Sequence, residues 1–171
     1  RATAGAPRPP APPTTPPTAV SANCLPSAGD RWGTTIYAEF DDRLGCPTSS
    51  VSTTTAAFQI FNKGLMVWRE DIDVVYVLHY HDGSFDTYNV SGIPTTYANA
   101  MPDMLKGAFG YLWNTHQSIQ DSIQHPLQSE FLASNFAVQS YANGTIFYFL
   151  ENNANNYILF NNSGTWLTRR E

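Results

Sequence analysis

Charge is scarce in this chain of 171 residues, since Asp, Glu, Lys and Arg together make up only 13% of it. That is about half of the share usual in globular domains. A net charge of −5 predicts no basic surface, which argues against a nucleic acid or an anionic membrane as a partner. No apolar run approaches the roughly 18 residues of a membrane span, so no membrane span is expected. The surface should be polar without being charged.

The motifs of common enzymes are also absent. The chain has no Gly-x-Ser-x-Gly, Cys-x-x-Cys or His-Glu-x-x-His sequence and no glycine-rich phosphate loop, each of which indicates a particular chemistry. We therefore expect no enzymatic activity, no cofactor and no metal site. An envelope hydrolase with two carboxylates is a minor alternative, because sequence spacing alone selects no such pair.

Cysteine occurs only twice, as Cys24 and Cys46. A disulfide between them would close a loop of about 23 residues and contribute roughly 3 kcal/mol to stability. It would also tie the N-terminal segment to the rest of the chain. Two unrelated buried thiols are the alternative, because free cysteines are readily buried.

Three Asn-x-Ser/Thr sequences are possible acceptors of N-linked glycans. They begin at Asn89, Asn143 and Asn161. The last two fall in predicted hairpin turns, where turn chemistry alone would also favour Asn. Together with the cysteine pair and the low charge, these sites predict an extracellular or cell-surface protein with covalently attached glycans.

Prolines are concentrated in residues 1–26, which we predict to form an extended arm. A polyproline II arm of 20 residues would reach roughly 60 Å, beyond a body of about 40 Å. Such a segment buries too little surface to be ordered alone, so it needs a surface to hold it. That surface is the chain's own body, a neighbouring copy or another protein. The residues assigned to assembly are Arg8, Pro9, Pro10, Pro12, Pro13, Pro16, Pro17 and Val20, and Thr14, Thr15 and Thr18 are candidates for O-glycosylation.

The rest of the chain resembles itself at a spacing of 79 to 81 residues. Turn glycines and large aromatic residues recur at this spacing, which predicts a duplicated supersecondary unit. The corresponding pairs are Pro47 and Pro126, Phe61 and Tyr141, Gly64 and Gly144, Trp68 and Tyr148, Tyr76 and Tyr157, Gly83 and Gly164, and Phe85 and Trp166. We expect repeat 1 at residues 27–88, a connector at 89–101 and repeat 2 at 102–171.

Each repeat is predicted to be a helix followed by a β-meander. Helical spacing connects Trp32, Ile36, Phe40 and Leu44, with Asp30 as the cap and Gly45 as the stop, and it connects Met104, Leu105, Ala108, Phe109 and Leu112 in the second copy. Strands are expected at residues 58–62, 65–70, 74–80, 84–88, 138–142, 145–150, 157–160 and 165–168. The predicted fold class is α+β, mainly antiparallel β, with two tandem helix-plus-β-meander repeats forming one body behind an extended proline-rich N-terminal arm.

Two predicted strands, residues 65–68 and 145–150, are apolar on both faces. A half-exposed strand should alternate instead. The helices, the other repeat or a neighbouring subunit must therefore cover the second face.

Some polar and aromatic groups invite a ligand but are interpreted more simply. His79 and His81 would lie on one side of a strand, yet Phe160 and Asn162 occupy the corresponding places in repeat 2, which favours a surface position over a metal site. The acidic residues of the 70–73 segment are interpreted as a solvated turn rather than a calcium loop. The four tryptophans are expected mainly in the core, with a sugar-stacking platform as the alternative.

The run RLGCPTS followed by FNKGLMVWR resembles the LGFP-type repeats of bacterial surface and cell-wall proteins. The matching positions are Leu44, Gly45, Pro47, Thr48, Phe61, Gly64 and Trp68. The second copy has lost the Leu-Gly pair and has Ile123 and Gln124 there. The resemblance implies a surface location and an association with the cell envelope or a polysaccharide, and it assigns no catalytic residue.

The sequence therefore leads to two hypotheses about function. The first is an extracellular structural subunit that assembles into a filament of its own copies, through an N-terminal arm that docks on a neighbouring subunit. The second is a cell-wall or polysaccharide-binding module in which the prolines form a linker.

Overall fold

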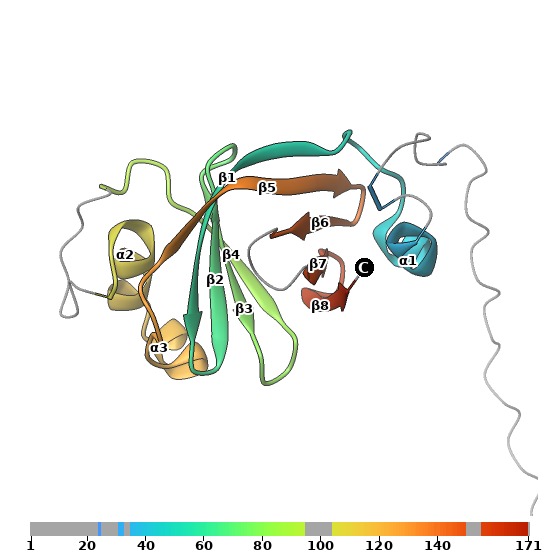
Figure 1. Ribbon diagram of the computed structural model, residues 1–171. Coiled ribbons are helices and arrows are strands. Elements are labelled where there is room, and N and C mark those ends of the chain that lie inside the picture. The colour runs from blue at the N-terminus through green and yellow to red at the C-terminus, as the bar shows by residue number, and fades with distance from the viewer. Residues whose placement is uncertain (1–23, 25–30, 33–34, 95–103, 150–154, 171) are drawn as a thin grey trace, which may run out of the picture.

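Eight antiparallel strands form one sheet in the computed structural model, which describes residues 24, 31–32, 35–94, 104–149 and 155–170 (Figure 1). The strand order is β4-β3-β2-β1-β5-β6-β7-β8, so each half of the sheet is a meander and β1 pairs with β5 in the middle. The strands are β1 (Ser52–Phe61), β2 (Gly64–Arg69), β3 (Val74–His79), β4 (Phe85–Asn89), β5 (Phe131–Tyr141), β6 (Gly144–Tyr148), β7 (Asn155–Phe160) and β8 (Thr165–Arg170).

The sheet curls until its two outer strands nearly meet. The turn before β4 pairs with the turn before β8 through a bridge between Ser84 and Thr165. The Phe85 amide donates to the Gly164 carbonyl at 2.9 Å, and the Trp166 amide donates to the Gly83 carbonyl at 2.7 Å. The nearly closed sheet encloses one hydrophobic cluster to which both halves contribute, with members that include Phe58, Leu65, Leu78, Phe136, Phe147, Phe149 and Leu159.

In the described ranges, three helices cover the outside of the sheet. Each helical segment packs on the half of the sheet that does not directly follow it in the chain. Helix α1 (Ile36–Leu44), which precedes β1, packs on β5, β6 and β7. Helices α2 (Gly107–Thr115) and α3 (Gln117–Ile123), which precede β5, pack on β1, β2 and β3. In Figure 1 they lie at opposite ends of the sheet. This arrangement explains why two predicted strands are apolar on both faces. One face of each strand points into the enclosed cluster, and the other face lies under a helix.

The first helix is shorter than its sequence pattern predicts. It begins at Ile36 with Thr35 at the N-cap position, so the prediction that Asp30 caps it is wrong. Trp32 precedes the helix but is fully buried, and its indole nitrogen donates to the Asn156 side chain at 2.6 Å. Gly45 ends the helix at φ 69°, as expected for a residue at this position.

The second helical segment begins at Gly107 rather than near residue 102, and it is followed by α3, which the sequence pattern did not predict. The strands β1 and β5 begin six to seven residues before their predicted starts. These early residues are mostly polar on β1, and they pair with the other long strand across the middle of the sheet. The alternation of polar and apolar residues within a strand cannot reveal a pairing with a strand so far away in the sequence.

Two turn glycines serve a different purpose from the one predicted. Gly64 and Gly144 are the first residues of β2 and β6, and neither has a positive φ. A side chain at Gly64 would overlap with Ile123, and one at Gly144 would overlap with the Leu159 carbonyl. Close packing, not turn geometry, therefore requires these two glycines. The positive φ expected at Gly83 and Gly164 is present, at 68° and 62°.

The same backbone contacts join helix ends to hairpins in both halves. The Asn143 amide donates to the Leu44 carbonyl at 2.8 Å, and the Lys63 amide donates to the Ile123 carbonyl at 3.0 Å. One residue further along, Gln124 has a φ of 65° where Gly45 has 69°. Each helical segment is thus attached to the turn of the hairpin that it covers.

Candidate functional site

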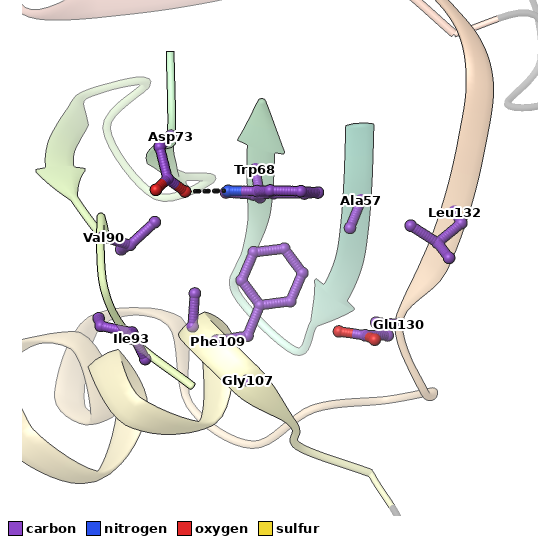
Figure 2. Close-up of a pocket in the computed structure, with 10 residues that line it drawn as sticks. Ala57, Trp68, Asp73, Val90, Ile93, Gly107, Phe109, Glu130 and Leu132 are labelled. Atoms are coloured by element: carbon purple, nitrogen blue, oxygen red, sulfur yellow. Dashed lines mark hydrogen bonds between the residues drawn. The ribbon is translucent and has the colours of Figure 1, made fainter. Parts of the chain in front are cut away.

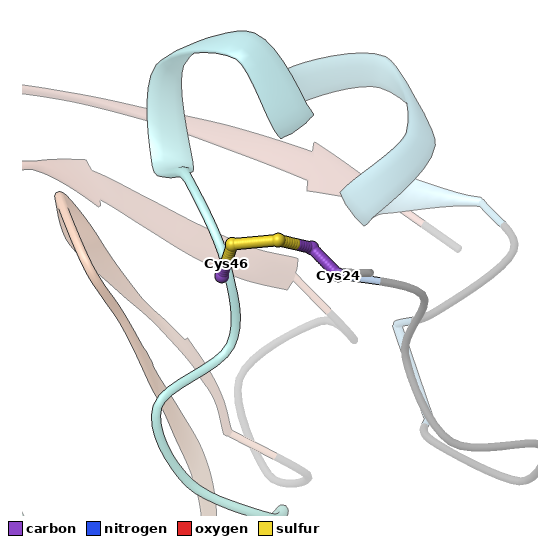
Figure 3. The surroundings of a disulfide bond; sticks show 2 residues. All are labelled: Cys24 and Cys46. Atoms are coloured by element: carbon purple, nitrogen blue, oxygen red, sulfur yellow. A yellow bond between two sulfur atoms is a disulfide. The ribbon is translucent and has the colours of Figure 1, made fainter. Parts of the chain in front are cut away.

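The disulfide predicted between Cys24 and Cys46 is present, with the two Cα atoms 5.1 Å apart (Figure 3). Cys46 follows α1 by two residues, so the disulfide fixes the C-terminal end of the predicted arm beside that helix. The arm residues Arg8 to Val20, and the threonines Thr14, Thr15 and Thr18, lie outside the described residues.

A pocket of about 460 Å³ lies at the α2 end of the sheet. Figure 2 shows the Trp68 indole projecting from β2, with the Phe109 ring of α2 next to it and Leu132 of β5 on another side. Most of its lining is apolar, and Leu132 is 62% exposed at its rim. An open cavity with aromatic walls is the usual form of a site that binds a small molecule or a short peptide segment.

Two carboxylates accompany the aromatic walls. The Trp68 indole nitrogen donates to Asp73 Oδ1 at 3.0 Å, which holds both side chains in place. Asp73 itself sits at a φ of 52°, in the turn between β2 and β3. Glu130 lies exposed just before β5, and within the described part of the chain its carboxylate forms no hydrogen bond or ion pair. The pocket is therefore apolar inside and negatively charged at its edge.

Sequence reasoning placed Trp68 in the core and took Asp73 for part of a solvated turn. Trp68 is in fact half-buried and packs against the outer cluster of its half of the sheet. Glu130 and Leu132 were not predicted, because they come from a segment about 60 residues away that only the pairing of β1 with β5 brings close. No local pattern in the sequence could have indicated this pocket.

His79 and His81 do not both lie in a strand, although both line one small open pocket. His79 ends β3 and is buried, with Nε2 3.1 Å from Asp86 Oδ2, whereas His81 lies exposed in the turn. Their rings are 6.1 Å apart. Among the described residues, no three potential ligands converge to hold a metal ion. In the 70–73 segment, Asp71 pairs with Arg69 at 2.6 Å and Asp73 binds Trp68, so both carboxylates already have partners within the chain.

The three possible glycan acceptors differ in accessibility. Asn89 at the end of β4 and Asn161 in the turn before β8 are exposed, and both line an open groove between the outer strands. Asn143 is half-buried in the β5–β6 turn, against the end of α1. Glycosylation at all three stays a prediction, and the geometry ranks Asn143 as the least accessible acceptor.

The fold and the pocket define a protein with a nearly closed antiparallel sheet, three short covering helices and one disulfide. None of the helices in the described ranges is long and apolar enough to cross a membrane. The comparisons with known proteins give no matching family model, no matching curated protein and no matching solved structure.

Proposed function

We propose that this protein is an extracellular structural subunit that assembles into a filament through its N-terminal arm, which docks on a neighbouring subunit. One observation carries the proposal. The disulfide that anchors the arm lies beside α1, whereas the open aromatic pocket is lined by residues of α2. These two helices lie at opposite ends of the sheet (Figure 1). An arm at one end of the subunit and a pocket that receives it at the other end produce a head-to-tail contact. Repetition of this contact produces a fibre unless the subunits close into a ring.

Four further features support parts of this proposal. The disulfide fits an oxidising compartment, and the exposed acceptors Asn89 and Asn161 would carry glycans on the outside of the subunit. The matched contacts at the ends of α1 and α3 support an origin of the body by duplication of one helix-plus-meander unit. The resemblance to LGFP-type repeats supports a place at the cell surface.

Deletion of residues 1–22 tests the proposal, because it removes the arm and keeps Cys24 and the whole described fold. We expect the intact protein to form filaments visible by negative-stain electron microscopy. The shortened protein should stay monomeric in light scattering and should still unfold in one cooperative thermal transition, which shows that its body is folded. Filaments that assemble normally without the arm would refute the proposal.

A second candidate function is a cell-wall or polysaccharide-binding module, and the pocket favours it as well. Sugar rings stack on exposed aromatic side chains such as Trp68, and carboxylates such as Asp73 accept hydrogen bonds from hydroxyl groups. This function predicts that the monomer binds an oligosaccharide, for example chitohexaose or cellohexaose, and that Trp68→Ala abolishes binding. Titration calorimetry of the shortened protein with both sugars separates the two functions.

A further inference from the structure

In the second half of the sheet, the position that corresponds to the pocket of the first half is filled by side chains of the same chain. Trp68 pairs with Ala57 across β2 and β1, and Tyr148 pairs with Ala137 across β6 and β5. The Arg31 guanidinium lies over the Tyr148 ring, 3.9 Å from its centroid, and Tyr148 is only 6% exposed. In this half, an arginine of the same chain covers the aromatic side chain.

No cation–π contact covers Trp68 within the described residues. Its surroundings are nevertheless suited to a cation, because the indole face attracts a guanidinium and two carboxylates, Asp73 and Glu130, line the same pocket. A guanidinium also binds carboxylates through paired hydrogen bonds. The chemistry of the pocket thus indicates a ligand that combines an arginine with apolar groups.

The arm has that composition. Residues 1–23 contain two arginines and no Asp or Glu. The arm therefore carries a positive charge, and the net charge of the remaining residues is more negative than the −5 of the whole chain. Arg8 is followed directly by Pro9 and Pro10, then by Pro12 and Pro13. Proline-rich segments in the polyproline II conformation dock in grooves lined by aromatic side chains.

We infer that the Trp68 pocket is the receptor for residues 8–13 of a neighbouring copy, with Arg8 at Asp73 and Glu130 and the prolines against Trp68 and Leu132. This inference rests on the proposed assembly through the arm and names its contact surface. A sugar contacts Trp68 equally well but leaves the exposed carboxylate of Glu130 without a cation, so the arm is the better match.

The reach of the arm favours a neighbour over the chain's own pocket. Arg8 lies 16 residues before Cys24, which gives about 50 Å of extended chain at roughly 3.1 Å per residue. A body of about 40 Å diameter requires a path of roughly 60 Å over its surface from one end to the other. The arm therefore reaches the pocket of the next subunit more easily than its own.

Charge reversal in the full chain tests the contact. We expect Arg8→Glu and Glu130→Arg each to raise the critical concentration for assembly by about tenfold or more, because each places like charges together. An equimolar mixture of the two variants should assemble again, because its contacts alternate between two reversed residues, Glu at position 8 with Arg at position 130, and two original residues, and both kinds of contact join opposite charges. Asp121→Arg, an exposed acidic position on α3, is the matched control and should assemble like the unchanged protein.

The outcomes separate this contact from the assembly itself. If the intact protein forms filaments, the arm deletion abolishes them, and yet both reversals assemble normally, then the pocket assignment is wrong and the proposed function stands. A mixture that fails to assemble also overturns the contact, and so does a monomeric intact protein. Loss of chitohexaose binding in Glu130→Arg with unchanged assembly would assign the pocket to a sugar instead. Thermal melting confirms that each variant is folded.

Discussion

Trp68 and Tyr148 occupy the same place in their two hairpins, opposite Ala57 and Ala137, but their surroundings differ. Tyr148 is buried under α1 and the Arg31 guanidinium. Trp68 is held by Asp73 at the edge of an open pocket. The same backbone arrangement therefore supports a closed surface in one half and an accessible cavity in the other. The side chains outside the sheet, and not the sheet itself, determine which half can bind a partner.

The largest effect is expected where the two halves are most alike, at Gly64 and Gly144. Gly144→Ala should lower the free energy of unfolding by about 3 kcal/mol and Gly64→Ala by about 2 kcal/mol. The difference arises because a Cβ at position 144 meets the Leu159 backbone carbonyl more closely than one at position 64 meets the Leu78 backbone carbonyl, at 2.7 Å, and the other close neighbour of position 64 is the Ile123 side chain. Urea denaturation followed by circular dichroism measures both changes.

Gly92→Ala is the matched control for these substitutions. Gly92 has a φ of 83° and no atom within 4 Å of the added Cβ, so it reports backbone strain alone, at about 1 kcal/mol. A control that costs as much as Gly144→Ala would show that close packing is not the reason for the glycines.

A smaller effect concerns Tyr157, where the halves meet inside the sheet. Burial, with the nearby Tyr80 of the first half, raises the pKa of Tyr157 to about 12. The unfolded value is about 10. The folded state binds the Tyr157 proton more tightly than the unfolded state does. The contribution of this tyrosine to the free energy of unfolding is therefore complete below pH 10 and is lost as the pH rises towards 12. The loss should be on the order of 2 kcal/mol at pH 12.

Tyr157→Phe removes this titration. The stability of the variant, measured by urea denaturation between pH 9 and 12, should fall less steeply than that of the unchanged protein. The absorbance of tyrosinate should show one late-titrating group fewer. Parallel pH curves for the two proteins would contradict the assignment.

The smallest effect is expected at Gln124, which has the backbone conformation of Gly45 without being glycine. Its φ of 65° and ψ of −149° lie in a region that favours glycine. Gln124→Gly should raise the free energy of unfolding by about 1 kcal/mol, after the loss of the exposed hydrogen bond from Asn62. Thermal melting measures the change.

The reciprocal substitution, Gly45→Ala, should destabilise the protein, because Gly45 has both the positive φ and neighbouring atoms at 3.1 and 3.2 Å from an added Cβ. If both substitutions change the stability in the same direction, then the two positions are not equivalent.

Local patterns in the sequence predicted the elements that depend on near neighbours. The helix that ends at Gly45, the hairpins that follow residues 61 and 141, and the disulfide of Cys24 were all recognised in this way. The pairing of β1 with β5 was missed because its early residues are largely polar and their partners are about 80 residues away.

The candidate site was only partly predictable for the same reason. Trp68 stood out as a recurring aromatic position, but its accessibility depends on α2 and on residues 130–132, which no spacing rule places beside it. The exchange of helices between the halves was not predicted either. Hydrophobic periodicity shows that a strand needs cover on two faces, but it does not identify which helix supplies that cover.

That exchange makes each half of the chain dependent on the other. A fragment that ends after β4 would expose the outer face of its own strands and would carry α1 with nothing to cover, and the complementary fragment would have the reverse defect. The two fragments should therefore recover the fold only by associating. In physical terms, the two halves exchange their covering helices within one chain, as the members of a domain-swapped dimer exchange an element between chains.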